Sequence, residues 1–186
     1  MLKPRHEMRA SRRTVVAGAI TVALICGPVL AAAASSTPSG ATLNPRVPSC
    51  TSAELVEWLD TDANGAAGTI YYKVEFTNLS GHSCTLRGYP GVSGIRLGGA
   101  QLGSAASRSV GTPVKTVTLG NGKTAISALG ITEVGNFPAS SCHPTTAAGL
   151  RVYAPNQTAA KTIPFPFGAC AKPGDLYLSI QAVKLS

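Results

Sequence analysis

The sequence predicts an all-β protein whose main body is an antiparallel, immunoglobulin-like β-sandwich held by two disulfides. Three observations lead to this prediction. Segments with apolar residues at every second position recur along the chain, turns rich in glycine and proline separate them, and four cysteines follow an amino-terminal segment with the pattern of an export signal. We expect one such domain over residues 50–186, a length sufficient to bury a substantial core.

The amino-terminal segment, residues 1–34, has the three parts of a bacterial secretory signal peptide. Basic residues come first, an uncharged apolar run from Val15 to Leu30 follows, and Ala31–Ala34 supply the small residues of a cleavage site. We therefore expect cleavage near Ala34 or Ser35 and a mature protein that is secreted or associated with the cell wall. The basic residues of the leader are Lys3, Arg5, Arg9, Arg12 and Arg13.

Details of this leader bear on membrane attachment and on the export route. The apolar run is shorter than the roughly 20 residues of a membrane-spanning helix and contains Gly18, Gly27 and Pro28, so a retained anchor is the less favoured alternative. Cys26 lacks the small residue that precedes a lipidated cysteine, and we do not predict lipid attachment. The segment Ser11–Val16 resembles a twin-arginine signal, so two export routes stay open.

Net charge gives a weak indication about partners. The chain has 16 basic and 8 acidic residues; removing the five bases and the one acid of residues 1–34 leaves 11 and 7, a net charge of +4. The remaining bases are scattered singly along the sequence, so we predict no nucleic-acid partner. A mild positive charge is compatible with attraction to an anionic cell wall.

Residues 35–49 are predicted to form a linker. Ser, Thr, Pro, Gly and Ala dominate this stretch, and its apolar residues show no periodicity. Such a composition is typical of an extended tether between an export site and a folded domain.

Four cysteines lie in the predicted mature protein, namely Cys50, Cys84, Cys142 and Cys170. An even number in an exported chain predicts two disulfides, because thiols outside the cytoplasm are not kept reduced. Three pairings are formally open. We favour Cys50–Cys84 and Cys142–Cys170, because each bond then closes a loop within one half of the domain. Metal binding by the thiolates is less favoured, since the chain has no C-x-x-C pair.

The strongest strand prediction is Thr69–Asn78, where Ile70, Tyr72, Val74 and Phe76 alternate with polar residues or Tyr71. A capped turn is expected at Thr51–Leu55, before a first strand at Val56–Leu59. Asn121-Gly122 predicts a tight hairpin between its flanking strands, because both residues tolerate positive φ. The other predicted strands are Cys84–Leu86, Val92–Leu97, Val114–Leu119, Lys123–Glu133, Leu150–Ala154, Lys161–Pro164 and Leu176–Lys184.

Several of these segments resemble the uncharacterised actinobacterial domain family DUF4232. The residues that carry the resemblance are Cys50, Ala53–Leu55, Gly68, Phe76–Asn78 and Cys84–Val92, the last containing the specific segment C-T-L-x-G-Y-P. The resemblance extends to about Leu185 and implies an exported or envelope-attached β-sandwich domain. The family has no established activity, so the resemblance implies no catalytic residue.

Three aromatic residues are candidates for surface recognition. Tyr89 lies in a Gly-Tyr-Pro-Gly segment, for which a structural corner is favoured over a binding loop. Phe165 and Phe167 flank Pro166 and follow Pro164, so we expect an exposed aromatic loop that does not pair regularly in a sheet. Trp58, beside Leu55 and Leu59, is predicted to belong to the core.

No arrangement of residues predicts a reaction. Glu54 and Glu57 are interpreted as a solvated edge rather than a catalytic carboxylate pair. We therefore expect a non-catalytic interaction module, without metal or cofactor, whose partner is a cell-wall glycan or a co-exported protein. The alternative is a small extracytoplasmic hydrolase or metal-binding protein that uses His82 or His143, both of which lie close to a cysteine in turn-like sequence.

Overall fold

The computed structural model describes residues 46–186. The predicted leader and residues 35–45 of the predicted linker lie outside the described residues, so the cleavage site and the export route stay predictions. Across residues 46–186, none of the helices has the length and apolar character needed to cross a membrane.

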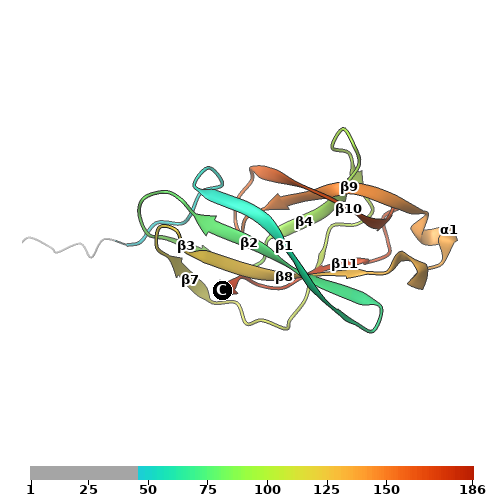
Figure 1. Ribbon diagram of the computed structural model, residues 1–186, viewed down its shortest axis with the longest axis horizontal. Helices are drawn as coiled ribbons and strands as arrows, with labels where there is room; N and C mark the ends of the chain where they lie inside the picture. Colours follow the sequence, from blue (N-terminus) through green and yellow to red (C-terminus); the bar gives the residue numbers. More distant parts are fainter. Residues whose placement is uncertain (1–45) are drawn as a thin grey trace, which may run out of the picture. The chain divides into compact units, whose positions relative to one another are not determined.

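The larger sheet has six strands (Figure 1). Its order is β1 (Leu55–Ala66), β2 (Thr69–Asn78), β8 (Thr124–Thr132), β11 (Leu178–Ile180) and β6 (Ser107–Arg108), with β12 (Lys184–Leu185) also paired to β8. All pairs are antiparallel except β11 with β6. The register of β1 shifts between Asp60 and Asn64, where the strand has an irregularity of the β-bulge type.

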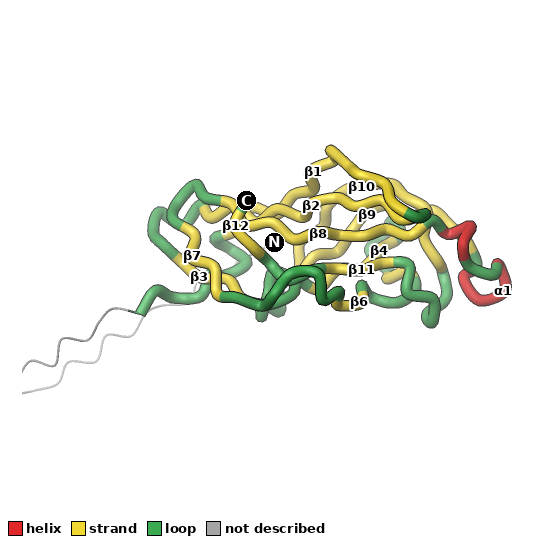
Figure 2. The backbone as a smooth tube through the Cα atoms, turned by 90° about the horizontal axis from the view of Figure 1, so that it is seen from below, coloured by secondary structure: helices red, strands yellow, loops and turns green. Residues whose placement is uncertain are grey.

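A second sheet has the order β10 (Ala160–Cys170), β9 (Pro144–Tyr153), β4 (Gly91–Ile95) and β5 (Gln101–Leu102). A separate two-stranded sheet is formed by β3 (Cys84–Arg87) and β7 (Thr116–Leu119). The 3₁₀ helix η1 (Val134–Asn136) and the short helix α1 (Ala139–Cys142) connect β8 to β9. Both views of the domain place α1 at one end and β3 and β7 at the other (Figures 1 and 2).

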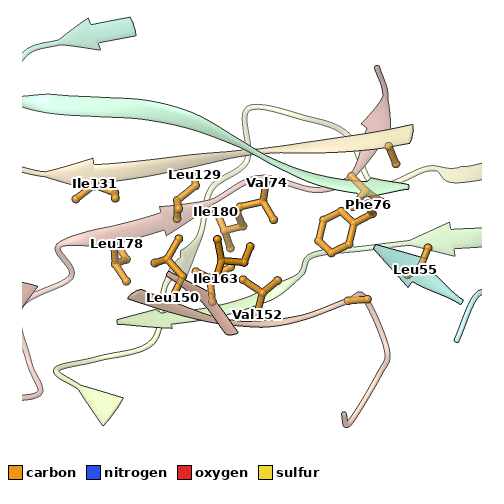
Figure 3. Close-up of a cluster of buried hydrophobic side chains, with 14 of the residues drawn as sticks. Leu55, Val74, Phe76, Leu129, Ile131, Leu150, Val152, Ile163, Leu178 and Ile180 are labelled. Carbon is orange, nitrogen blue, oxygen red and sulfur yellow. The ribbon is translucent and has the colours of Figure 1, made fainter. Parts of the chain in front are cut away.

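Alternation along the strands builds the core between the two larger sheets. Val74 and Phe76 of β2 are fully buried, whereas their neighbours Lys73 and Glu75 are only partly buried. Leu150 and Val152 approach from β9, and Figure 3 shows these apolar side chains meeting between the strands. Full burial of one such side chain stabilises the fold by about 1.5–3 kcal/mol. The predicted antiparallel β-sandwich is confirmed.

Most strand predictions are confirmed, although several strands are longer than expected. Strand β2 has the predicted bounds, whereas β1 continues to Ala66 and β9 begins at Pro144. The predicted turn before β1 is present, because the carboxylate oxygen Oε2 of Glu54 accepts hydrogen bonds from the backbone N–H and hydroxyl of Thr51 at 2.8 and 2.9 Å. It closes a single turn rather than starting a helix, and β1 follows directly.

The hairpin predicted at Asn121-Gly122 is wrong, although a tight turn is present. Gly122 has φ +75°, and Lys123 N–H donates to the Gly120 carbonyl at 3.1 Å. However, β7 pairs with β3 and β8 pairs with β2, so the turn carries the chain from one sheet to another. Asn78 at the end of β2 holds the turn, because its side-chain amide donates to the Leu119 carbonyl at 2.9 Å and its backbone bonds Gly122 and Lys123.

Both predicted disulfides are confirmed. Cys50–Cys84 joins the segment before β1 to the start of β3, and Cys142–Cys170 joins α1 to the end of β10. All four cysteines are fully buried. The bonds therefore fasten opposite ends of the domain, because β3 and α1 lie at opposite ends (Figure 1).

The predictions for Trp58 and Glu57 are both wrong, and for the same reason. Leu55 occupies the inner face of β1, so alternation places Glu57 inward and Trp58 outward. Trp58 is 49% exposed. Both carboxylate oxygens of Glu57 are buried and have no hydrogen-bond partner among the described residues. Burial raises the pKa of Glu57 to about 7, an effect that the positive charge of Lys161 partly opposes.

Candidate functional site

Tyr89 lies in the connection between β3 and β4, two residues after the end of β3. Gly88 precedes it with φ +108°, a conformation that favours glycine, and the Gly88 carbonyl accepts a hydrogen bond from Val183 N–H at 2.9 Å. The ring of Tyr89 is half-buried, and the guanidinium carbon of Arg108 lies 5.4 Å from its centroid. This distance allows a cation–π interaction. Tyr89 thus forms a corner of the fold and also contributes to the surface.

A groove of about 580 Å³ lies on one side of this corner. The segment 46–49 forms one wall, and it is fixed against β3 by hydrogen bonds from Cys50 N–H to the Thr85 carbonyl and from Thr85 N–H to the Pro48 carbonyl, at 2.9 and 2.8 Å. The last residues of the predicted linker therefore belong structurally to the domain. The lining residues are Arg46, Val47, Pro48, Ser49, Thr85, Arg87, Thr116, Pro155 and Asn156.

A second groove, of about 560 Å³, adjoins the first, because Arg87 and Asn156 line both. Asn156 has φ +60° in the turn after β9, and its side-chain amide donates to the Arg87 carbonyl at 3.0 Å. This contact fixes the ridge between the grooves. The other residues that line the second groove are Gly88, Tyr89, Gly91, Arg108, Val114, Tyr153, Ala154 and Gln157.

The charge of the two grooves has one sign. Arg46, Arg87 and Arg108 line them, and no carboxylate from the described part of the chain does. The two ion pairs within residues 46–186 are Lys73–Asp60 and His82–Glu54, neither of which involves these arginines. Most acidic residues of the domain instead lie on or just before β1 and β2, namely Glu54, Glu57, Asp60, Asp62 and Glu75. The joined grooves, called the basic grooves below, therefore suit an anionic ligand.

The exposed loop predicted around Phe165 and Phe167 is wrong, because both residues belong to β10. The pairing of β10 with β9 shifts register between Pro164 and Phe167, and this irregularity accommodates both prolines. Strand β10 is also an edge strand, where a residue without an N–H group is tolerated. Phe165 and Phe167 are half-buried and pack against the core.

These two rings line a cavity of about 220 Å³ between the two larger sheets. The ring centroids of Phe165 and Tyr72 are 5.0 Å apart in an edge-to-face arrangement, and those of Phe165 and Phe167 are 5.9 Å apart. The residues that line this intersheet cavity are Ile70, Tyr72, Ile131, Thr132, Glu133, Phe165, Pro166, Phe167 and Gly168. Phe165 and Phe167 thus remain accessible to a ligand in a cavity rather than on a loop.

The two histidines of the alternative interpretation do not meet. His82 precedes β3 and His143 ends α1, elements at opposite ends of the domain (Figure 2). The side chain of His82 is 51% exposed, and its Nε2 lies 3.4 Å from Glu54 Oε1. The nearby Ser80 hydroxyl donates to the His82 carbonyl at 2.9 Å, so it is not directed to the imidazole. His143 has φ +49° and is exposed.

One cluster among residues 46–186 has the spacing of metal ligands, and it contains a disulfide. The sulfur atoms of Cys142 and Cys170 and a carboxylate oxygen of Asp175 lie within 4.8 Å of one another. Because the two sulfurs are bonded to each other, they are not thiolates, which are the form that binds metals. Oδ2 of Asp175 is buried without a hydrogen-bond partner among the described residues.

The arginines of the basic grooves were missed by the sequence interpretation. Arg46, Arg87 and Arg108 are far apart in the chain and are not part of a basic run. The folded chain brings them together because the segment before Cys50 pairs with β3 and because β6 lies in the larger sheet. The signal that was available is that Arg87 directly precedes the Gly-Tyr-Pro-Gly corner.

Comparisons with known proteins identify the family. Neither a search of curated proteins nor a search of solved structures found a match. The family model described as a domain of unknown function (DUF4232) matches residues 50–184, which include both disulfides and nearly all the strands. The sequence resemblance is thereby confirmed, and the chain belongs to the DUF4232 family.

Proposed function

We propose that this protein is a non-catalytic, extracytoplasmic binding module whose basic grooves hold an anionic glycan of the cell envelope. The observation that carries the proposal is the meeting of three arginines, without any carboxylate, in two adjoining grooves. The leader-like amino terminus and the two disulfides support a site of action outside the cytoplasm.

The side chains of the grooves have the donors that an anionic glycan needs. Arginine binds carboxylate or phosphate through parallel N–H groups, and exposed guanidinium groups such as that of Arg87 are free to do so. Asn156 and Gln157 provide amides, which bond sugar hydroxyls in both directions. Tyr89 and Tyr153 provide aromatic rings with a polar tip, which combine apolar contact with hydrogen bonding.

The arrangement of the grooves suits a polymeric ligand. The two grooves, of about 580 and 560 Å³, lie on either side of a ridge and share Arg87 and Asn156, so one chain of several sugars can contact both. Arg46 lines the first groove only and Arg108 the second only, so successive charged units meet different arginines. Several weak contacts of this kind add up when they are linked in one ligand.

The hydrolase alternative receives less support. It needs an imidazole beside a nucleophile in a cleft, whereas His82 lies on an open turn and neither histidine lines the basic grooves. The metal-binding alternative needs the two histidines to converge, and they lie near opposite ends of the domain.

Isothermal titration calorimetry of the full chain tests the proposal. The probes are polygalacturonate as a carboxylate polymer, poly(glycerol phosphate) as a phosphodiester polymer, dextran as a neutral glycan and single-stranded DNA. We expect binding of polygalacturonate, of poly(glycerol phosphate) or of both, and no binding of dextran. Preference for DNA, binding of dextran with equal affinity, or cleavage of a polymer without measurable binding would contradict the proposal.

A pair of matched double variants separates the grooves from net charge. Arg87→Gln with Arg108→Gln removes two groove charges, and we expect the affinity for the bound polymer to fall about tenfold. Arg96→Gln with Lys172→Gln removes two exposed charges outside the grooves, so its affinity should change less than about threefold. Equal losses in the two variants would show attraction by overall charge alone.

A further inference from the structure

We propose a second binding site, in the intersheet cavity, for the quaternary ammonium head group of a small ligand. The cavity lies between the larger sheet and β10, towards the end of the domain that carries η1 and α1. Its ligand chemistry is opposite to that of the basic grooves. The inference is independent of the proposed function, because no residue lines both places.

Aromatic rings form much of the wall of this cavity. Tyr72 from β2 meets Phe165 and Phe167 from β10 there. The ring centroid of Phe165 lies 5.0 Å from that of Tyr72 and 5.9 Å from that of Phe167. The faces of such rings carry partial negative charge, and several rings around one space bind ammonium groups that bear methyl substituents. All three rings are half-buried, so each retains surface for a ligand.

Glu133, an exposed residue, supplies a carboxylate that lines the same cavity. It follows the end of β8, where its backbone N–H is fixed by the Gly68 carbonyl at 2.8 Å. Among residues 46–186 it is the only acidic residue that lines the cavity, and no Lys or Arg of this range lines it. Neither ion pair within residues 46–186 involves its carboxylate. A cation in the cavity would therefore meet an acidic group and aromatic rings without a competing internal cation.

The apolar lining selects a methylated cation rather than a small hydrated one. Ile70, Ile131 and Pro166 form much of the remaining wall, and their side chains offer no hydrogen bonds to replace the water of Na⁺ or of a simple ammonium ion. The Thr132 hydroxyl also lines the cavity, but it is hydrogen-bonded to the Thr69 hydroxyl at 3.0 Å. Methyl groups on nitrogen gain from contact with these side chains. With about 220 Å³ the cavity is smaller than the ~300–1,000 Å³ of sites for whole drug-sized ligands, so it fits a head group.

The rigid frame around the cavity is consistent with binding. Tyr72 and Ile131 lie on neighbouring strands, because β2 and β8 pair through nine residues from Thr69 to Thr77. Across the cavity, Phe167 pairs with Ala147 of β9, just beyond the register shift of β10. Phe165 and Phe167 line the cavity from β10, opposite Tyr72 and Ile131 of the larger sheet.

Titration with choline and with its neutral carbon analogue 3,3-dimethyl-1-butanol tests the charge requirement. The two molecules have the same shape, and only choline carries a positive charge. We expect the full chain to bind choline saturably and to bind the neutral alcohol about 3- to 10-fold more weakly, measured by calorimetry. Equal affinities would show an apolar cavity without cation recognition, and lack of choline binding by the folded protein would also contradict the proposal.

Three variants locate the site. Glu133→Gln should weaken choline about 2- to 5-fold and leave the alcohol unchanged, because only the charge of an exposed carboxylate is lost. Phe165→Leu keeps an apolar side chain but removes the ring, so it should likewise weaken the binding of choline more than that of the alcohol. Trp58→Leu removes an exposed aromatic residue that does not line the cavity and should change neither affinity. Thermal unfolding of each variant verifies folding, and a loss in Trp58→Leu equal to that in Phe165→Leu would overturn the assignment.

Discussion

The basic grooves and the intersheet cavity are built by different parts of the fold. The grooves form where strand ends and connections meet around Tyr89, and their arginines come from widely separated segments. The cavity is built mainly by side chains within β2, β8 and β10, between the two larger sheets. One sandwich thus places exposed charge on its connections and aromatic ring faces between its strands, and these are the features on which the two proposed sites rest.

The two disulfides lie at opposite ends of the domain. Removing either one should have a larger effect on stability than any other change considered below. Cys50–Cys84 holds the segment that forms one wall of the first groove, whereas Cys142–Cys170 lies beside α1. They close loops of similar length, with separations of 34 and 28 residues. Replacing either pair by alanine should lower the free energy of unfolding by about 2–5 kcal/mol, measured by urea denaturation.

The two double-alanine variants should lose similar amounts of stability but should differ in their affinity for the polymer. At a temperature where both remain folded, Cys50→Ala with Cys84→Ala should weaken polymer binding in the basic grooves. Cys142→Ala with Cys170→Ala should leave that binding within about threefold of the parent protein. If the second variant lost polymer binding and the first kept it, the basic grooves would be assigned to the wrong end of the domain.

The salt dependence of affinity should also differ between the basic grooves and the intersheet cavity. Contacts between exposed arginines and a charged polymer weaken as the Debye length shortens from about 14 Å at 0.05 M to about 4 Å at 0.5 M salt. We expect polymer affinity to fall at least about tenfold over this range, because several charges act together. Choline binding relies on half-buried rings and should fall less than about threefold. Similar salt dependence of the two ligands would contradict the distinction.

Because Glu57 points inward, replacing it should change the pH dependence of stability without changing binding. This change should be smaller than that caused by removing a disulfide. Its pKa is raised from 4.5 to about 7 by burial, so the folded state favours the protonated acid. The stabilisation from this group is complete below pH 4.5 and is lost as the pH rises through about 7. Between pH 4.5 and 8, the free energy of unfolding of Glu57→Gln should therefore rise by about 1 kcal/mol relative to that of the parent protein. The full effect is reduced because the residue as a whole is only half-buried, although its two carboxylate oxygens are covered.

Urea denaturation at several pH values measures this gain. Glu75→Gln is a suitable control, because Glu75 lies on the outer face of the same sheet and its pKa is raised less. A constant difference between Glu57→Gln and the parent protein from pH 4.5 to 8 would contradict the account. Neither variant touches the basic grooves or the intersheet cavity, so both should bind polymer and choline normally.

Local patterns in the sequence predicted much of the fold. Alternation located β2, and the pairing of cysteines by proximity in the chain was correct for both disulfides. Partners in a sheet were harder to predict, because a turn such as Asn121-Gly122 has the same residues whether it joins two paired strands or two sheets. The two prolines led to the wrong prediction of an exposed loop around Phe165 and Phe167, because the edge position and register shift of β10 accommodate Pro164 and Pro166 within a strand.

The candidate sites could be predicted only in part. Tyr89, Phe165 and Phe167 were identified because aromatic residues beside glycine or proline stand out in a sequence. Their partners Arg108, Tyr72 and Glu133 were not, because each comes from a strand or connection distant in the chain. Contacts of this kind depend on which sheet a strand joins, and a local pattern does not contain that information.

In this proposal, one domain carries two independent sites, one for an anionic polymer and one for a cationic head group. The most direct test titrates the full chain with choline by calorimetry, first alone and then after saturation with the anionic polymer that it binds. The account predicts a choline affinity that agrees within about twofold in the two titrations, since coupling between the sites is absent. Loss of choline binding in the presence of polymer, or failure of either ligand to bind the folded protein, would contradict it.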